Sequence, residues 1–220
     1  MKKTLIIIAV CVVLALGILF AAASVVVYSD DTGNHIALVS EVQLFSNKDL
    51  RKFTEIELKT DNLDVQFIAA DDYGLEFMVS RAGNITFTNE QGKLTVTETA
   101  NRLLFYINAP GKNDYLKVYY PKDAGPELLS ATGVSGEISF EGIAAKEFKI
   151  KTDSGNIIMN IPEAGESYNK DISVVSGSVT IDGAAVENKY KSEDEKAENS
   201  LTVSSESGTV TINFKGRQSE

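Results

Sequence analysis

Apolar and polar residues alternate strictly along the second half of the chain, and the alternation changes parity at four Ser-Gly dipeptides. These are Ser135-Gly136, Ser154-Gly155, Ser176-Gly177 and Ser207-Gly208. Counted from each serine as position zero, apolar residues occupy even positions before the serine and odd positions after it. Around Ser154, for example, Ile150 is at position −4 and Ile157 at position +3. A straight strand cannot change parity without turning its apolar side chains to the other face. We therefore predict a corner at each Ser-Gly, where glycine adopts a backbone conformation that other residues resist.

The repeated phrase predicts coils that stack on one another. Each coil would supply two short strands joined at the corner, and would bury its apolar face only against its neighbours. Two sets of apolar side chains should then form internal ladders. They are Ile138, Ile157, Val179 and Val210, and beside them Phe140, Met159, Ile181 and Ile212. The predicted fold class is all-β, a single-chain β-solenoid-like repeat domain.

A shorter version of the phrase precedes the repeats. It spans Ile56–Phe67 and has Asp61-Asn62 at the corner. Residues 75–120 then alternate with period two, and Asn89–Gly92 interrupts them with a loop whose length and glycine are typical of a β-hairpin. We expect a more conventional antiparallel N-terminal part in front of the solenoid-like repeats.

The last repeat is displaced along the chain. Successive serines of the phrase are separated by 19, 22 and 31 residues, and the polar segment 184–200 accounts for the longest spacing. We interpret 184–200 as an insertion at one bend, with a flexible loop favoured over a helix. The domain is predicted to cover 53–216, including this insertion, and to be followed by a polar tail, 217–220.

The N-terminus carries a long uncharged run. Lys2 and Lys3 precede it, and its 23 residues from Leu5 to Val27 would span about 34 Å as a helix, enough for a bilayer core of about 30 Å. We predict a cytoplasmic tip and transmembrane signal-anchor in 1–29 and a juxtamembrane linker in 30–52. The charge pattern places the N-terminus in the cytoplasm and the domain outside the cell membrane. The alternative is a cleaved signal peptide, since Ala21–Ala23 are small residues at cleavage-type spacing.

Charge and composition exclude several functions. The formal net charge is −10 and no large basic patch is present, which argues against nucleic acid and anionic lipid surfaces as partners. His35 is the only histidine, and the sequence contains no P-loop, dinucleotide fingerprint or calcium loop. We therefore predict no cofactor, no metal site and no catalytic residue, and so not an enzyme.

The residues that point outward beyond the corners form the best candidate for a binding face. They are Glu137, Ser139, Asn156, Asn160, Ser178, Thr180, Thr209 and Thr211. Short polar side chains of this kind suit a flat surface that lies along a glycan or another β edge, although ordinary solvation of an outer face is the commoner reason for such residues. Tyr106, Tyr115, Tyr119, Tyr120 and Tyr168 are scattered in the sequence and predict no sugar platform.

The region from Phe53 to Lys215 resembles the bacterial "putative adhesin" domain-of-unknown-function family, also called toastrack domains. The resemblance rests on LKTDNLDVQFIAADD, on LKVYYPKD at Leu116–Asp123, and on the phrases SGEISF, SGNIIMNI, SGSVTI and SGTVTI. It implies a β-solenoid-like domain, commonly outside the membrane, that is linked to envelope stress or surface interaction. The family offers no catalytic residues to carry over.

Three functional hypotheses remain. The first is a non-catalytic, membrane-anchored extracytoplasmic module that binds an envelope protein or glycan. The second is a structural protein that assembles into homo-oligomers through its open coil ends, where backbone would be unpaired. The third is an envelope glycan hydrolase, which requires clustered acids on one face, whereas the strand positions beyond the corners carry one acid, Glu137.

Overall fold

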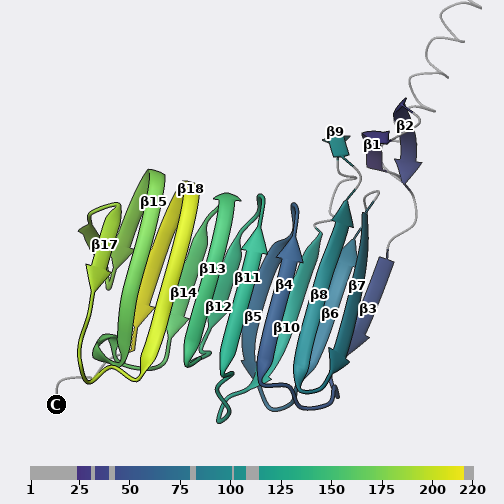
Figure 1. Cartoon of the computed structure of the whole chain (residues 1–220). Coiled ribbons are helices and arrows are strands. Elements are labelled where there is room, and N and C mark those ends of the chain that lie inside the picture. Colours follow the sequence, from purple (N-terminus) through teal and green to yellow (C-terminus); the bar gives the residue numbers. More distant parts are fainter. Residues whose placement is uncertain are drawn as a thin grey trace, which may run out of the picture. The chain divides into compact units, whose positions relative to one another are not determined.

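The computed structural model describes residues 24–30, 33–39, 43–79, 83–100, 102–107 and 114–215 (Figure 1). They divide into two compact units. One contains an antiparallel sheet of three strands in the order β2 (Gly33–Val39), β1 (Ser24–Asp30) and β9 (Arg102–Ile107). The other contains 45–77, 85–99 and the chain from 115 onward, and it holds the repeats.

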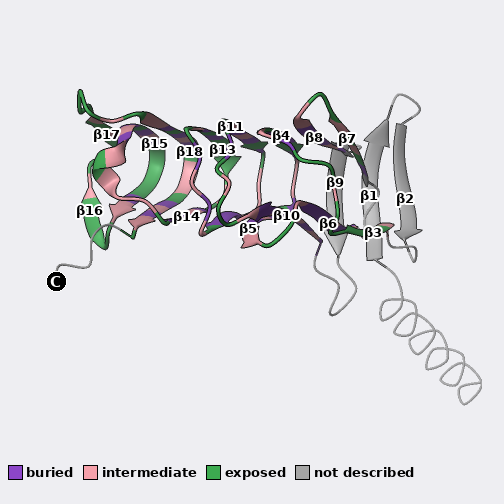
Figure 2. Ribbon diagram, turned by 90° about the horizontal axis from the view of Figure 1, so that it is seen from below, coloured by how far each residue is buried: buried purple, intermediate pink, exposed green. Residues whose placement is uncertain are grey.

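In the larger unit the sheet forms two walls that face each other (Figure 2). Wall A contains, in spatial order, β3 (Gln43–Asn47), β6 (Gly74–Val79), β10 (Tyr115–Pro121), β5 (Asp64–Ala70), β12 (Ile138–Glu141) and β14 (Ile157–Ile161). Wall B contains β7 (Gly83–Glu90), β8 (Lys93–Ala100), β4 (Glu55–Thr60), β11 (Leu128–Gly133) and β13 (Glu147–Ser154). Two longer strands, β18 (Asn199–Phe214) and β15 (Tyr168–Ile181), pass through both walls around the corner.

Parallel pairing aligns the repeats into buried ladders between the walls. One ladder consists of Leu116, Val65, Ile138, Ile157, Val210 and Val179, all of them buried. In the next ladder the rings of Phe67 and Phe140 stack with centroids 4.5 Å apart. Each such side chain stabilises the fold by about 1.5–3 kcal/mol. The predicted all-β, solenoid-like fold and the membership of its internal ladders are confirmed.

The coils do not stack in the order of the sequence. Ser207 of β18 pairs with Ser154 of β13 on one side and with Ser176 of β15 on the other, so the last repeat lies between the two before it. Lys170 accounts for this order, since it occupies an inward position that is Phe148 or Leu201 in neighbouring coils. An ammonium group enclosed by apolar layers is costly, whereas the end of the stack gives it polar partners.

The segment 184–200 is not the flexible loop that we expected. It contains β16 (Ala184–Val186) and β17 (Lys189–Ser192), which pair antiparallel with the two halves of β15. Because β15 is the last coil, its outer edge would otherwise present unpaired N–H and C=O groups. The insertion therefore covers the end of the stack.

The strands of the middle region are only partly antiparallel. Gln91 and Gly92 form a two-residue turn between β7 and β8 with φ of 51° and 78°, as a type I′ hairpin requires, so the predicted hairpin is confirmed. However, β8 pairs in parallel with β4, and β10 pairs in parallel with β5. The prediction of an antiparallel part is wrong for these pairs, because long connections allow the chain to return in the same direction and extend both walls.

Among the residues that the structure describes, no helix is long and apolar enough to cross a membrane. The predicted span lies outside the described residues as far as Ala23, and its last residues, Ser24–Val27, belong to strand β1. The predicted linker 30–52 contains β2 and β3, and His35 lies in β2 opposite Tyr28. The tail 217–220 also lies outside the described residues.

Candidate binding face on wall A

The four Ser-Gly corners form a column along the stack. Their glycines all have positive φ, with values of 104° at Gly136, 157° at Gly155, 133° at Gly208 and 148° at Gly177. A Cβ on any of them would overlap a backbone carbonyl oxygen of the neighbouring coil, which belongs to Leu63, Gly136, Gly155 and Gly208 respectively. The glycines therefore let adjacent coils approach more closely than a side chain permits.

The serines beside these glycines make bonds within the corners. Ser135 Oγ bonds to Asn62 Oδ1 in the first coil, and Ser154 Oγ donates to the carbonyl oxygen of Val134 at 3.3 Å. Ser176 and Ser207 lie at aligned positions in β15 and β18. These contacts give the serines a role in the corner, and no histidine lies among the described side chains that could activate them.

Seven of the eight residues predicted for the binding face reach solvent on wall A. Asn156, Ser178 and Thr209 are exposed, and Glu137, Asn160, Thr180 and Thr211 are half-buried. Ser139 is the exception, because it is 8% exposed and its hydroxyl donates to the carbonyl oxygen of Val65 at 3.3 Å. Ser139 is therefore not accessible to a ligand, and the prediction is wrong for this residue.

Hydrogen bonds between coils fix several of these side chains. Asn160 Nδ2 donates to Glu141 Oε1 at 2.8 Å, and Asn213 Nδ2 donates to Asn160 Oδ1 at 2.9 Å. Asn156 Oδ1 accepts the backbone N–H of Thr209 at 3.1 Å. Adjacent strands are about 4.8 Å apart, so these groups repeat at that interval across the wall. We call this surface the polar strip. It consists of Asn156, Asn160, Ser178, Thr180, Thr209, Thr211 and Asn213.

Beyond β12 and β5, the wall A strands β10 and β6 carry a second group of polar side chains, which the sequence pattern did not predict. Tyr115, Lys117 and Tyr119 alternate with buried residues on β10, and both tyrosine hydroxyls donate to Glu76 of β6, at 2.9 Å and 3.2 Å. Lys117 Nζ lies 4.6 Å from the centroid of the Tyr115 ring, and Lys48 Nζ lies 5.2 Å from that of Tyr119. We call Lys48, Glu76, Tyr115, Lys117 and Tyr119 the tyrosine cluster. The alternation of Tyr115, Lys117 and Tyr119 in the sequence could have predicted that these three side chains lie together, because residues two apart in a strand share a face.

Two positive charges and one negative charge interact within the tyrosine cluster. Burial alone would raise the pKa of Glu76, but hydrogen bonds from Tyr115 and Tyr119 and the positive charges of Lys117 and Lys48 bring it below its ordinary value. Burial, together with the carboxylate of Glu76, raises the pKa of both tyrosines. The cluster thus holds an ionised carboxylate and two neutral phenols at neutral pH.

The outer face of wall B is different in character. Hydrogen bonds from Lys59 and Lys93 lower the pKa of Glu57 to about 2, and its carboxylate lies 2.8 Å and 2.5 Å from their ammonium nitrogens. Lys149 and Glu147 form a further pair at 2.6 Å. These charges are satisfied by one another, whereas wall A presents mostly neutral donors and acceptors.

Nothing in the described part of the chain forms a metal-binding group of three or more His, Cys, Asp or Glu side chains. Asp71 of the Asp71-Asp72 turn lies 3.4 Å from Lys122 Nζ. The polar strip and the tyrosine cluster can donate hydrogen bonds, accept them and pack against a ligand.

A sequence model described as Toastrack DUF4097 matches residues 53–160 and 144–213. The chain belongs to the toastrack family. The match covers the coils of both walls, which confirms the resemblance seen in the repeated phrases. No curated protein matches the sequence.

Solved structures with a similar arrangement include a "putative cell adhesion protein" from Clostridium sporogenes, with 16% identity, a TM-score of 0.48, and coverage of 80% of this chain and 100% of that one. A "putative adhesin" from Parabacteroides distasonis has 9% identity, a TM-score of 0.29, and coverage of 80% and 94%. A "putative lipid binding protein" from the same species has 10% identity, a TM-score of 0.27, and coverage of 80% and 95%.

Proposed function

We propose that this toastrack chain is a non-catalytic binding module outside the cell membrane, and that the outer face of wall A holds an envelope glycan. The observation that carries the proposal is the presence on one wall of the tyrosine cluster, on β6 and β10, and of the mostly neutral polar strip, on β14, β18 and β15. Both features lie on the same side of one continuous wall, on strands paired from β6 through β15.

The chemistry of this face suits a sugar chain. The rings of Tyr115 and Tyr119 offer flat apolar surface with polar edges, and Lys48 and Lys117 add donors. The threonine hydroxyls and asparagine amides of the polar strip both donate and accept hydrogen bonds. Hydrogen bonds between coils hold Asn160 and Asn213 in place, so little side-chain entropy is lost on binding.

The proposal includes attachment to the membrane through the N-terminal segment. With Ser24–Val27 assigned to β1, the apolar run from Leu5 to Ala23 keeps 19 residues, or about 28 Å as a helix. Its lysines favour a cytoplasmic N-terminus. The intact mass of protein extracted from membranes tests retention of this segment, because cleavage near Ala21–Ala23 would remove it.

Removal of both rings from the tyrosine cluster tests the binding proposal. The full chain and the double variant Tyr115→Leu/Tyr119→Leu are incubated with insoluble envelope polysaccharide from the native cells, and bound protein is measured by co-sedimentation. We expect the double variant to bind about tenfold more weakly, since aromatic anchors of a binding site contribute a large share of affinity.

The matched control is Tyr190→Leu, which removes a tyrosine of β17 outside wall A's outer face. Equal binding by wild type and the double variant, or an equal loss in Tyr190→Leu, would contradict the proposal. Assembly through the coil end gains no support from the structure. The end strand β17 has only four residues and carries Lys189 and Lys191, features that discourage edge pairing.

A further inference from the structure

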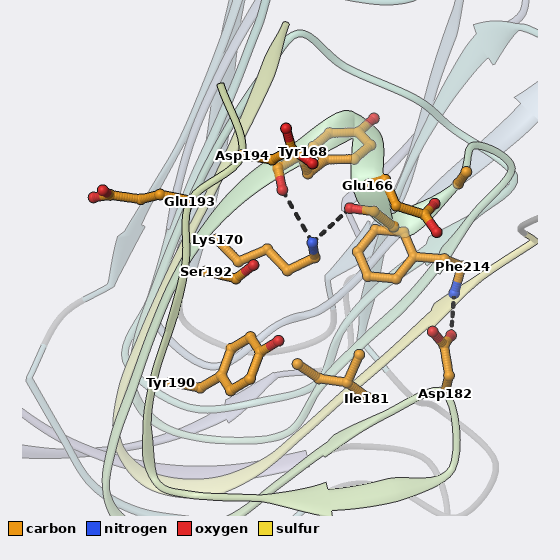
Figure 3. A pocket seen from close by; sticks show the side chains of 12 residues that line it. Glu166, Tyr168, Lys170, Ile181, Asp182, Tyr190, Ser192, Glu193, Asp194 and Phe214 are labelled. Atoms are coloured by element: carbon orange, nitrogen blue, oxygen red, sulfur yellow. Dashed lines mark hydrogen bonds between the residues drawn. The ribbon is translucent and has the colours of Figure 1, made fainter. Parts of the chain in front are cut away.

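A hollow of about 960 Å³ opens where the coil stack ends at β15 (Figure 3). Strand β17 extends wall B one step beyond β15, placing Tyr190 opposite Ile172 and Ser192 opposite Lys170. Phe214 and Ile181 line the hollow from wall A. Within the described part of the chain, β15 is the last coil between these two walls. The volume lies within the range of small-molecule binding sites.

The single ammonium group in the lining is already engaged. Lys170 is 8% exposed, and its Nζ donates to the carbonyl oxygens of Gly165 at 2.5 Å and Tyr168 at 3.0 Å (Figure 3). The same nitrogen lies 5.4 Å from the centroid of the Phe214 ring. Burial lowers the pKa of Lys170, and the negative charges of Glu166, Asp182 and Asp194 offset part of this effect. Lys170 thus completes the wall and has neighbours that repel an incoming anion.

Carboxylates dominate the remaining polar lining. Glu166, Asp182 and Asp194 act on one lysine, Lys170, so three negative charges against one positive charge leave a net charge of −2. Glu193 also lines the hollow, but its side chain points away from Lys170 and pairs with Lys191 at 2.6 Å (Figure 3). The whole chain has a net charge of −10, which adds to the attraction for cations. A carboxylate or phosphate ligand would be repelled by these negative charges.

These carboxylates are arranged to accept hydrogen bonds. Asp182 accepts the backbone N–H of Phe214 at 2.7 Å, and Asp194 accepts that of Lys196 at 2.9 Å. The pair with Lys191 lowers the pKa of Glu193, whereas a general acid for glycoside hydrolysis needs a raised pKa. The arrangement favours binding of a charged group over proton transfer.

Aromatic and aliphatic surface lies beside the acids. Tyr190, Phe214, Ile181 and Ala164 line the same hollow. An ammonium or guanidinium group gains from aromatic faces as well as from carboxylates, and the methylene stem of a lysine or arginine packs on apolar surface. A neutral ligand would use the apolar surface but would gain less from the carboxylates of Glu166, Asp182 and Asp194.

We propose that this hollow binds the side chain of a lysine or arginine presented by a partner protein. The site is separate from the outer face of wall A and carries an independent ligand preference. Its charge and its aromatic lining together select an organic cation on an apolar stem.

Three small probes with one apolar body test the proposal: 4-phenylbutylamine, 4-phenylbutanol and 4-phenylbutyrate. Binding to the full chain in lipid nanodiscs is measured by equilibrium dialysis at low salt, with empty nanodiscs as the blank. We expect the amine to bind about tenfold more tightly than the alcohol, and the carboxylate to bind most weakly. Added salt should narrow the difference.

Two double variants with the same change in net charge locate the effect. Glu166→Gln/Asp194→Asn should reduce the preference for the amine to about twofold, because it removes charge from the hollow. Asp153→Asn/Glu206→Gln removes charge at the exposed corners outside the hollow and should leave the preference unchanged. Equal affinity for the amine and the alcohol, tighter binding of the carboxylate, or equal effects of the two variants would overturn the proposal.

Discussion

At the scale of single residues, the corner glycines connect the sequence pattern to the stability of the stack. Gly155 lies between Gly136 and Gly208, and each of the three would bring a Cβ against a backbone oxygen of the adjacent coil. The obstruction is backbone, so rotation of a side chain cannot relieve it. A positive φ at each position adds strain for any residue with a Cβ.

Gly155→Ala should therefore destabilise the domain far more than its size suggests. We expect a loss of about 3 kcal/mol and a midpoint of thermal unfolding lower by about 10 °C. The control is Ser178→Ala, an exposed position one residue beyond the Gly177 corner, which should change stability by less than about 0.5 kcal/mol. Calorimetry of the full chain measures both, and similar midpoints for the two variants would show that the corner is misassigned.

At the scale of strands and coils, the sequence predicts some features well and others poorly. The change from even to odd apolar positions predicted the corners and the residues that pair in each ladder. A strand with one buried face can pair in only one register, so the pattern determines the partners. The order of the coils was not predicted. The repeats have similar apolar patterns, so the sequence does not show which coil pairs in parallel with which. Lys170 was the available signal, as a lysine in an apolar ladder belongs at its end.

Other elements left weaker signals. Strands β16 and β17 have three and four residues and no buried side chain, so alternation could not reveal them. The tyrosine cluster depends on β6 lying beside β10, which the sequence did not predict. The hollow at the coil end depends on the order of the coils. Because that order was not predicted, the hollow was not predicted either.

Cysteine pairs at the corners test the coil order directly. In a Cys11→Ser background, Ser154→Cys/Ser207→Cys should form an intramolecular disulfide under mild oxidation. Paired residues on adjacent strands are about 4.8 Å apart, which is within disulfide reach. Mass spectrometry of non-reduced peptides detects the link.

The matched pair is Ser154→Cys/Ser176→Cys. These positions are separated by β18, and hence by about 10 Å, which is too far for a disulfide. The opposite result, with a link only between 154 and 176, would mean that the coils stack in sequence order.

At the scale of the whole molecule, a rigid coil stack presents distinct surfaces on its two walls and at its end. Wall B holds mutually paired charges, wall A holds the polar strip and the tyrosine cluster, and the coil end holds the acidic hollow. Burial between the walls fixes the strand residues of both outer faces, since they alternate with ladder residues. Binding at one surface can therefore be altered with little effect on the others.

A comparison of Thr211→Arg with Thr202→Arg shows which wall binds the glycan. Both residues lie on β18, but Thr211 faces outward on wall A and Thr202 on wall B. Affinity for envelope polysaccharide is measured for the full chain and for both variants. We expect about a tenfold loss for Thr211→Arg and a change of less than about twofold for Thr202→Arg. Unchanged binding by Thr211→Arg, or an equal loss in Thr202→Arg, would contradict the assignment of the binding face to wall A.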